Sequence, residues 1–592
     1  MSGRTVLRVA TVALGVLAAG GTGVHGSSAQ EQRPAADFVV DKARFELLRP
    51  AEPPLTAEGT GAYRGAIEVV PSGGGFIVVN DVGVEDYVKG IVEVPSSWPA
   101  EAQKAQAIAA RTYGLNRVQN PTPAPWGVAA HICPTDACQV YWGIRGEERE
   151  GGQNWIAAVN ATAGQVLLYN GRPIFAQYSA SNGGRSAAGS QPYLRSVPDP
   201  DDARTKLGHW QYSVPLSALA PLLGVQPPDT LTAVSRQGDA VVFTVRSPTP
   251  ATTAPPTTQP LLPLAPTTTA AAPAPAPEAS PATRQLSVPV GDFVSRANGG
   301  LPTPAGLPKA LPSSQFTLRT SGDSVVIDGG GWGHGVGMSQ YGALGKANRG
   351  MGAADILAAY YSGIRPSRPG GLPATIRVAI APESGALTVS SPGLFRIVDG
   401  QGRTVVPVAR GGWRATPAGG QVRITPPEDQ RGPIVVDALT VDPSSPEVGA
   451  PPTVHFEVSS PALVAVRIVP PGAPAQDLPP QVVNSGPVSV PVPPGATDGD
   501  YHLFLTAAAG PGRQAGVPVR FVVGDPQEGS APGVAVGGVV IPQSDGGGGG
   551  PSPALVVVAA ALLGGDLLLA RTARRRRQSA LTPAPPEPSG SA

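Results

Sequence analysis

The sequence has no excess of charge of either sign. Its 592 residues contain 43 Lys and Arg against 42 Asp and Glu. A surface that binds nucleic acid needs a basic excess on a folded domain to neutralise phosphates. The one dense basic cluster, residues 574–577, lies in a tail, so the composition argues against nucleic acid as a partner.

Aromatic residues are also scarce, at 5%, whereas Gly and Pro number 76 and 70. Gly and Pro together make up about a quarter of the chain, far above their usage in ordinary globular proteins. We therefore expect long flexible connectors between folded units. At roughly 150 residues per domain, the length predicts about three or four such units.

Apolar runs stand near both ends of the chain. Arg4 and Arg8 precede an apolar run and small residues ending at Ala29, which is typical of a secretory signal peptide over residues 1–29. A membrane anchor is the alternative, although the run is shorter than the ~20 residues that a bilayer requires. The apolar run at residues 553–570 predicts a transmembrane helix, and the basic, Pro-rich residues 571–592 predict a cytoplasmic tail after it. A helix lying on the membrane surface is the alternative there.

Cysteine is rare, with two residues, Cys133 and Cys138. Both fall in the part predicted to be exported, where disulfides form and persist. With His131 they could also supply three zinc ligands, but no fourth ligand stands nearby and the spacing fits no common structural site. We expect the disulfide, with zinc as the alternative.

The distribution of short strand-like runs, helices and turns predicts an α+β fold built from several units. An Ala-rich stretch after Pro99 predicts a long helix, because Pro is favoured in the first turn. The expected units are a mixed domain over residues 37–363 with a disordered Thr/Pro/Ala-rich insertion at 247–283, a small β module at 370–436, an immunoglobulin-like β-sandwich at 437–524 and a Gly-rich tether at 525–552.

Two segments carry the motifs. The first runs from Glu85 to Pro99, includes Glu93-Val-Pro-Ser-Ser-Trp98-Pro, and continues into the predicted helix. The second is Gly331-Trp-Gly-His-Gly-Val-Gly-Met-Ser-Gln-Tyr-Gly-Ala343. Together with Cys138-Gln-Val-Tyr141 and Ser179-Ala-Ser-Asn-Gly-Gly184, they resemble signature blocks of the stage II sporulation protein D family, which includes amidase enhancers. The resemblance covers about residues 37 to 363.

This resemblance implies a peptidoglycan lytic transglycosylase, with Glu93 as the catalytic acid and base. Such an enzyme cleaves the bond between N-acetylmuramic acid and N-acetylglucosamine in glycan strands, including strands without stem peptides. Because a sugar hydroxyl is the nucleophile, one carboxyl group suffices and no metal or organic cofactor is required. A solvated loop glutamate is the alternative interpretation of Glu93, whose apolar neighbours would raise its pKa while the following helix start would lower it.

Further residues in the motif blocks are candidates for substrate binding. Each has a structural alternative. For the loop at residues 181–183 it is a plain turn, and for His334 it is a role in bracing a turn. For Gln340 and Tyr341 it is the start of a helix, and for Arg111 it is an ion pair. The candidates are Ser181, Asn182, Gly183, His334, Gln340, Tyr341 and Arg111.

Two rival functions remain open at this point. The chain could be a non-catalytic glycan-binding protein that enhances a cell-wall amidase, or a structural envelope protein. In each case the expected partner is peptidoglycan, and the expected location is the cell membrane with a large extracellular domain facing the wall.

Overall fold

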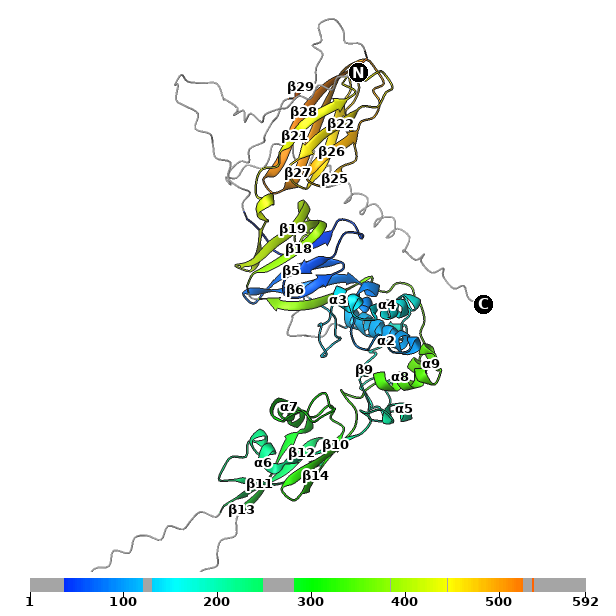
Figure 1. Ribbon diagram of the computed structural model, residues 1–592, viewed down its shortest axis with the longest axis vertical. Helices are drawn as coiled ribbons and strands as arrows, with labels where there is room; N and C mark the ends of the chain where they lie inside the picture. The colour runs from blue at the N-terminus through cyan, green and yellow to red at the C-terminus, as the bar shows by residue number, and fades with distance from the viewer. Residues whose placement is uncertain are drawn as a thin grey trace, which may run out of the picture.

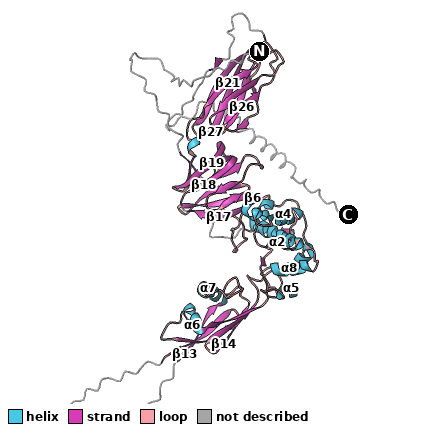
Figure 2. Cartoon of the chain, viewed as in Figure 1, coloured by secondary structure: helices cyan, strands magenta, loops and turns pink. Residues whose placement is uncertain are grey.

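The computed structural model describes residues 37–120, 130–248, 282–383, 385–444 and 446–524, together with the backbone of 535–536. The predicted signal peptide, most of the tether, the predicted transmembrane helix and the tail lie outside these residues. Within the described part of the chain, no helix is long and apolar enough to cross a membrane. Helices and sheets are both present, as the predicted α+β class requires (Figure 2).

One large antiparallel sheet joins strands from residues 38–83 to strands from residues 375–425. Its strand order is β1-β20-β19-β18-β2-β5-β6-β17, with β3 and β4 at one side. The strands are β1 (Phe38–Val40), β2 (Ala43–Leu47), β3 (Leu55–Ala57), β4 (Gly61–Tyr63), β5 (Ala66–Ser72), β6 (Gly75–Gly83), β17 (Thr375–Glu383), β18 (Leu387–Val398), β19 (Thr404–Ala418) and β20 (Gln421–Thr425).

The sheet corrects the prediction of a separate β module at residues 370–436. Strand β17 pairs with β6, and β18 pairs with β2, so Ile376 lies opposite Val82 and Ile397 lies opposite Phe45. All four side chains belong to a single hydrophobic core. Alternation of apolar residues identifies a strand but not its partner, and these partners are some 300 residues away.

A helical layer packs beside this sheet (Figure 1). Its helices are α1 (Val84–Lys89), α2 (Ala100–Gln119), α3 (Ile144–Glu148), α4 (Gly152–Ala161), α5 (Pro200–Ala203), α8 (Gln340–Asn348) and α9 (Ala353–Tyr360). Short strands connect them: β7 (Leu168–Tyr169), β8 (Arg172–Pro173), β9 (Tyr178–Ser179) and β16 (Met338–Ser339). Strands β9 and β16 pair in parallel and bring two of the motif blocks together.

Helix α2 is the centre of this layer. It begins after Pro99, as predicted, and Ala105 and Ala109 are fully buried. Small side chains allow close approach: a Cβ atom on Gly114 would lie 2.9 Å from Ile376 of the sheet and 3.1 Å from Tyr87 of α1. The Ala-rich composition thus serves tight packing, and α1 and α2 are held rigidly on either side of the loop that carries Glu93.

Residues 210–329 form a further unit with its own hydrophobic core. It consists of β10 (Trp210–Pro215), α6 (Leu216–Leu219), η2 (Pro221–Leu223), β11 (Thr230–Gln237), β12 (Ala240–Ser247), β13 (Ala282–Pro289), α7 (Val290–Gly300), β14 (Phe316–Ser321) and β15 (Ser324–Gly329). We call it the inserted domain. The Thr/Pro/Ala-rich segment starts and ends at neighbouring points of it, because Ser247 pairs with Ala282. The predicted insertion at 247–283 is therefore one hairpin connection within a larger inserted unit.

The C-terminal part of the described chain forms two antiparallel sheets around one core, as a β-sandwich does. After η3 (Glu428–Gln430), the first sheet contains β21 (Val436–Asp442), β22 (Thr453–Val458) and β26 (Gly486–Pro491). The second contains β23 (Ala462–Val469), β24 (Gln476–Asp477), β25 (Gln481–Val483), β27 (Gly499–Gly510), β28 (Arg513–Val523) and β29 (Ala535–Val536).

Candidate active site

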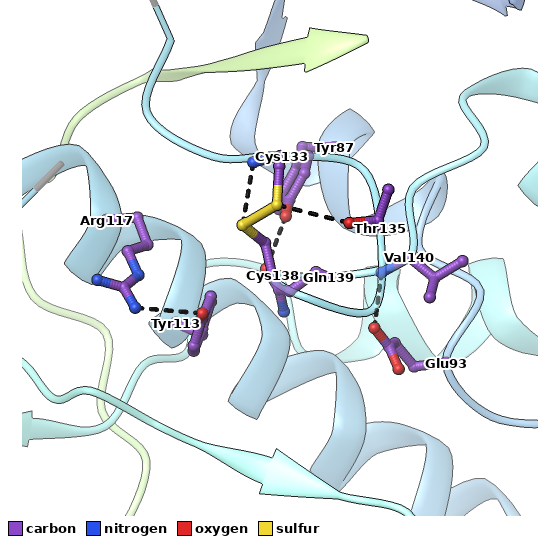
Figure 3. Close-up of a disulfide and its surroundings, with 9 residues drawn as sticks. All are labelled: Tyr87, Glu93, Tyr113, Arg117, Cys133, Thr135, Cys138, Gln139 and Val140. Atoms are coloured by element: carbon purple, nitrogen blue, oxygen red, sulfur yellow. Dashed lines mark hydrogen bonds between the residues drawn. A yellow bond between two sulfur atoms is a disulfide. The ribbon is translucent and has the colours of Figure 1, made fainter. Parts of the chain in front are cut away.

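Glu93 lies in the loop between α1 and α2, beside the segment that follows the two cysteines. Val92 N–H donates to the Val140 carbonyl at 2.8 Å, and Ile91 forms an isolated antiparallel bridge with Tyr141. This pairing places the Val140 N–H 2.7 Å from Oε1 of Glu93 (Figure 3). The Glu93 side chain is half-buried, so the solvated-loop interpretation does not hold.

Cys133 and Cys138 form a disulfide with their Cα atoms 5.5 Å apart, as expected. Their sulfurs are consequently not available as zinc ligands. The closed loop, which we call the disulfide loop (residues 133–138), is tightened by hydrogen bonds from Cys138 N–H to Thr135 O at 2.9 Å and from Tyr141 N–H to Pro134 O at 3.0 Å. It holds Gln139 and Val140 in place next to Glu93 (Figure 3).

A chain of hydrogen bonds leads from the buried core to the Glu93 carboxyl group. The Tyr87 hydroxyl donates to Oε1 of Gln139 at 2.6 Å, and Nε2 of Gln139 donates to the Tyr178 hydroxyl oxygen at 2.8 Å. The Tyr178 oxygen already accepts a hydrogen bond from Gln139, so its own O–H is free to donate a hydrogen bond to Glu93. Tyr178 is thus a directed donor to the carboxyl group.

Gln340 approaches the same carboxyl group from the second motif block. It is the first residue of α8, whose start is capped by Ser339 accepting the Gly342 N–H at 3.0 Å. Gln340 lies close enough to Glu93 to lower the pKa of its carboxyl group, and Nε2 of Gln340 donates to Oε1 of Gln106 in α2 at 3.4 Å. The two motif blocks, about 250 residues apart in sequence, therefore meet at one carboxyl group.

Burial raises the pKa of Glu93 to about 7, although hydrogen bonds from Val140, Tyr178 and Gln340 oppose the rise. The negative charge of Asp136 on the disulfide loop adds to it. Of the two opposing effects that the sequence suggested, desolvation wins. A carboxyl group with a pKa near 7 is partly protonated at neutral pH, as a general acid must be.

His334 and Tyr341 border this site. Nδ1 of the exposed His334 accepts the Val336 N–H at 3.0 Å, and the ring also hydrogen-bonds to the Tyr178 backbone. The half-buried Tyr341 ring packs edge-to-face on Trp98, with ring centroids 5.3 Å apart. Both remain candidates for contact with a sugar.

Ser181 and Asn182 correct our expectation of groove-lining side chains, because both residues are fully buried. Oγ of Ser181 donates to Asp202 at 2.7 Å, and Nδ2 of Asn182 donates to Asp199 at 2.9 Å. Asp202 also accepts the Ser339 hydroxyl at 2.7 Å, so this network ties the loop to the start of α8. The role of these side chains is to position Gln340.

Gly183 has a structural role in the same loop. Its φ is +69°, and a Cβ atom there would lie 2.9 Å from the backbone of Gly330. Only glycine combines this backbone conformation with so close an approach. The turn interpretation of the loop therefore accounts for it.

Arg111 corrects a further expectation. It is 1% exposed, and its guanidinium binds both carboxylate oxygens of Glu85 at 2.9 and 2.7 Å. It also donates to the carbonyls of Gln165 and Val159. Arg111 thus forms the structural ion pair that we weighed as the alternative to substrate contact.

The sequence analysis missed Tyr178, Gln139 and Val140 as parts of the site. Gln139 and Val140 belong to the quoted block Cys138-Gln-Val-Tyr141, so their place beside the disulfide was a usable signal. Tyr178 ends an ordinary apolar run and carries no such signal. Among the described residues, no group of three or more His, Cys, Asp or Glu could hold a metal ion.

Comparison with known proteins bears directly on this site. The family model of the stage II sporulation protein matches residues 72–169, which include Glu93 and the disulfide loop. The predicted resemblance to the stage II sporulation protein D family is confirmed. Stage II sporulation protein D of Bacillus subtilis is 27% identical over 306 residues, which cover 49% of this chain and 76% of that protein.

Two other relatives are each similar to about half of the chain. The amidase enhancer of Bacillus subtilis is 29% identical over 321 residues, covering 47% of this chain and 39% of that protein. An uncharacterized protein of Brachyspira hyodysenteriae is 28% identical over 313 residues, covering 51% of this chain and 71% of that protein. Similarity to the sporulation protein D family indicates a function related to the cell wall.

Proposed function

We propose that the protein is a lytic transglycosylase that cleaves the bond between N-acetylmuramic acid and N-acetylglucosamine in peptidoglycan strands. The observation that carries this proposal is the Glu93 carboxyl group. It is half-buried, has a pKa raised to about 7, and faces donors from three separate segments. An isolated carboxyl group tuned in this way suits one residue that acts first as acid and then as base.

In the first step, protonated Glu93 donates its proton to the glycosidic oxygen as the bond from that oxygen to the muramoyl C1 breaks. The N-acetylglucosamine part leaves as an alcohol. The muramoyl C6 hydroxyl then bonds to C1, and the Glu93 carboxylate takes the hydroxyl proton. The product is a 1,6-anhydro ring, and water takes no part in the reaction.

The hydrogen bonds around Glu93 support both steps. The Val140 N–H, Tyr178 and Gln340 lower the pKa of Glu93, so they stabilise the carboxylate that forms when the proton leaves. Without them, burial would hold the proton too tightly for transfer. Tyr178 and Gln340 therefore act as positioning residues that keep the pKa close to neutral.

The test is analysis of the products from purified glycan strands without stem peptides. The wild-type protein should release fragments ending in 1,6-anhydro-muramoyl sugars, identified by mass spectrometry. Glu93→Gln keeps the shape of the side chain but has no proton to donate, so it should abolish release while strands still bind. Full activity of Glu93→Gln would overturn the proposal.

The second candidate function is non-catalytic enhancement of a cell-wall amidase. The observation that favours it is the similarity to the amidase enhancer of Bacillus subtilis. In that case the protein should bind glycan and raise the rate of a purified amidase, and Glu93→Gln should raise it equally. The same pair of proteins thus separates the two candidates.

We also propose that the protein is exported and anchored in the cell membrane with its folded part facing the wall. The disulfide supports the extracytoplasmic location, because disulfides persist in oxidising compartments. The apolar run at 553–570 supports the anchor and lies outside the described residues. Protease added to intact protoplasts should remove the folded part but leave a short membrane-bound fragment.

A further inference from the structure

The inserted domain is fixed to the loop on one flank of Glu93, the glycine-rich segment Gly330–Gly337 that leads to Gln340 (Figure 1). Nε1 of Trp210 donates to the Gly331 carbonyl at 3.1 Å, and Gly331 N–H donates to Leu207 O at 2.7 Å. Oγ of Ser313 donates to Gly330 O at 2.6 Å. With these buried or partly buried bonds on both connecting segments, the domain has a firm attachment to this flank.

The same domain also reaches the opposite flank. Nζ of Lys309, in the loop between α7 and β14, lies 3.8 Å from Oδ2 of Asp136 on the disulfide loop. The disulfide loop leads directly to Val140, which donates to Glu93. The inserted domain therefore touches the segments on both sides of the carboxyl group.

We propose that the inserted domain forms a roof over the Glu93 site and that Lys309 and Asp136 close it as a clasp, so that a glycan strand enters by one end. This inference rests on the proposed function and concerns how the substrate is engaged. Strands are threaded from a free terminus, and internal bonds are cut only when the clasp is open.

The Lys309–Asp136 ion pair is weak enough to break readily. The side chains of Lys309 and Asp136 are 52% and 81% exposed, so water and salt screen their attraction. The attachment at the glycine-rich segment is hydrogen-bonded and largely shielded. When the ion pair breaks, the domain remains fixed at that end while the Lys309 loop is free to move away.

A charge-swap series tests the clasp. Lys309→Glu places two negative charges together and should open it, Asp136→Lys should open it by the opposite repulsion, and the double swap should close it again. Arg319→Glu makes the same charge change on an exposed position of β14, where the described residues give it no ion pair. It is the matched control for net charge and for the stability of the inserted domain.

The first readout is the rate of internal cleavage of long peptide-free strands, divided by the rate of cleavage of a tetrasaccharide that needs no threading. This ratio removes the effect of Asp136 on the pKa of Glu93. Wild type, the double swap and Arg319→Glu should release small terminal fragments first. Each single swap should shorten the mean strand length early, with a several-fold rise in internal cuts.

The second readout does not need catalysis. In a Glu93→Gln background, strands held by a closed clasp should dissociate slowly, and each single swap should speed dissociation several-fold with recovery in the double swap. Equal dissociation and equal cleavage patterns across the series would overturn the clasp. Absence of tetrasaccharide cleavage in every variant would instead overturn the proposed function, and the dissociation rates would still decide the clasp.

Discussion

Tyr178→Phe removes one donor from the Glu93 carboxyl group while keeping the ring in place. A hydrogen bond to a charged group is worth about 1.5–3 kcal/mol, and about 1.4 kcal/mol corresponds to one pKa unit. Because the Tyr178 hydroxyl favours the ionised form, its loss should raise the pKa of Glu93 from about 7 to roughly 8–9. The proton is then held over a wider range of pH.

The assay is the pH dependence of kcat/KM on glycan strands, with NMR titration of the labelled Glu93 carboxyl carbon as a readout independent of turnover. Activity that needs the protonated acid should fall as pH rises through the pKa of Glu93, and in the variant this fall should occur about one to two pH units higher.

Tyr361→Phe is the matched control. The Tyr361 hydroxyl is buried and donates to the carbonyl of Gln177 at 2.8 Å, next to Tyr178 in sequence. Its loss removes a comparable hydrogen bond without removing a donor from Glu93. An unchanged or lowered Glu93 pKa in Tyr178→Phe, or an equal upward shift in Tyr361→Phe, would refute the reasoning.

Three further predictions follow from the same contacts. Because the folded protein raises the pKa of Glu93 from 4.5 to about 7, burial of this group costs no stability at pH 4, costs more as pH rises from about 4.5 to 7, and reaches its full cost above pH 7. Glu93→Gln should therefore be equal to wild type in stability at pH 4 and more stable by up to about 3 kcal/mol at pH 8, as measured by urea unfolding at both pH values. Replacing Cys133 and Cys138 together by Ser should cost about 1–3 kcal/mol of stability. Because Val140 is then no longer held beside Glu93, the change should lower kcat more than it raises KM. A kcat equal to that of wild type would contradict this positioning role of the disulfide. Arg111→Met should reduce folded yield through loss of its buried ion pair with Glu85, whereas the folded fraction should bind strands with wild-type affinity in equilibrium binding; a large loss of affinity would restore the substrate-contact interpretation.

The sequence predicted Glu93 and one of the residues beside it as parts of the site because short motifs carry them. Glu93 and Gln340 stand in blocks whose residue types and order are specific, and the paired cysteines indicated a closed loop. The helix after Pro99 was predictable from its composition and its start signal. These features depend on neighbours in sequence.

Other features depend on partners far away in sequence and could not be predicted in this way. The pairing of β17 with β6 unites residues 375–383 with 75–83, so the supposed module at 370–436 belongs to the first domain. Ser181 looked like an accessible loop residue, but Asp202, 21 positions further on, buries it in a hydrogen bond. Likewise, Tyr178 is important only because the fold brings Gln139 and Glu93 to its hydroxyl group.

The central claim is that Glu93 enables a sugar hydroxyl, and not water, to break the glycan bond. The most direct measurement is digestion of purified strands in water enriched with oxygen-18, followed by mass spectrometry of the new muramoyl ends. The account predicts anhydro ends with no label from the solvent. One atom of oxygen-18 per cleavage would show hydrolysis, and strands that remain uncut would leave binding without catalysis; either result would contradict the account.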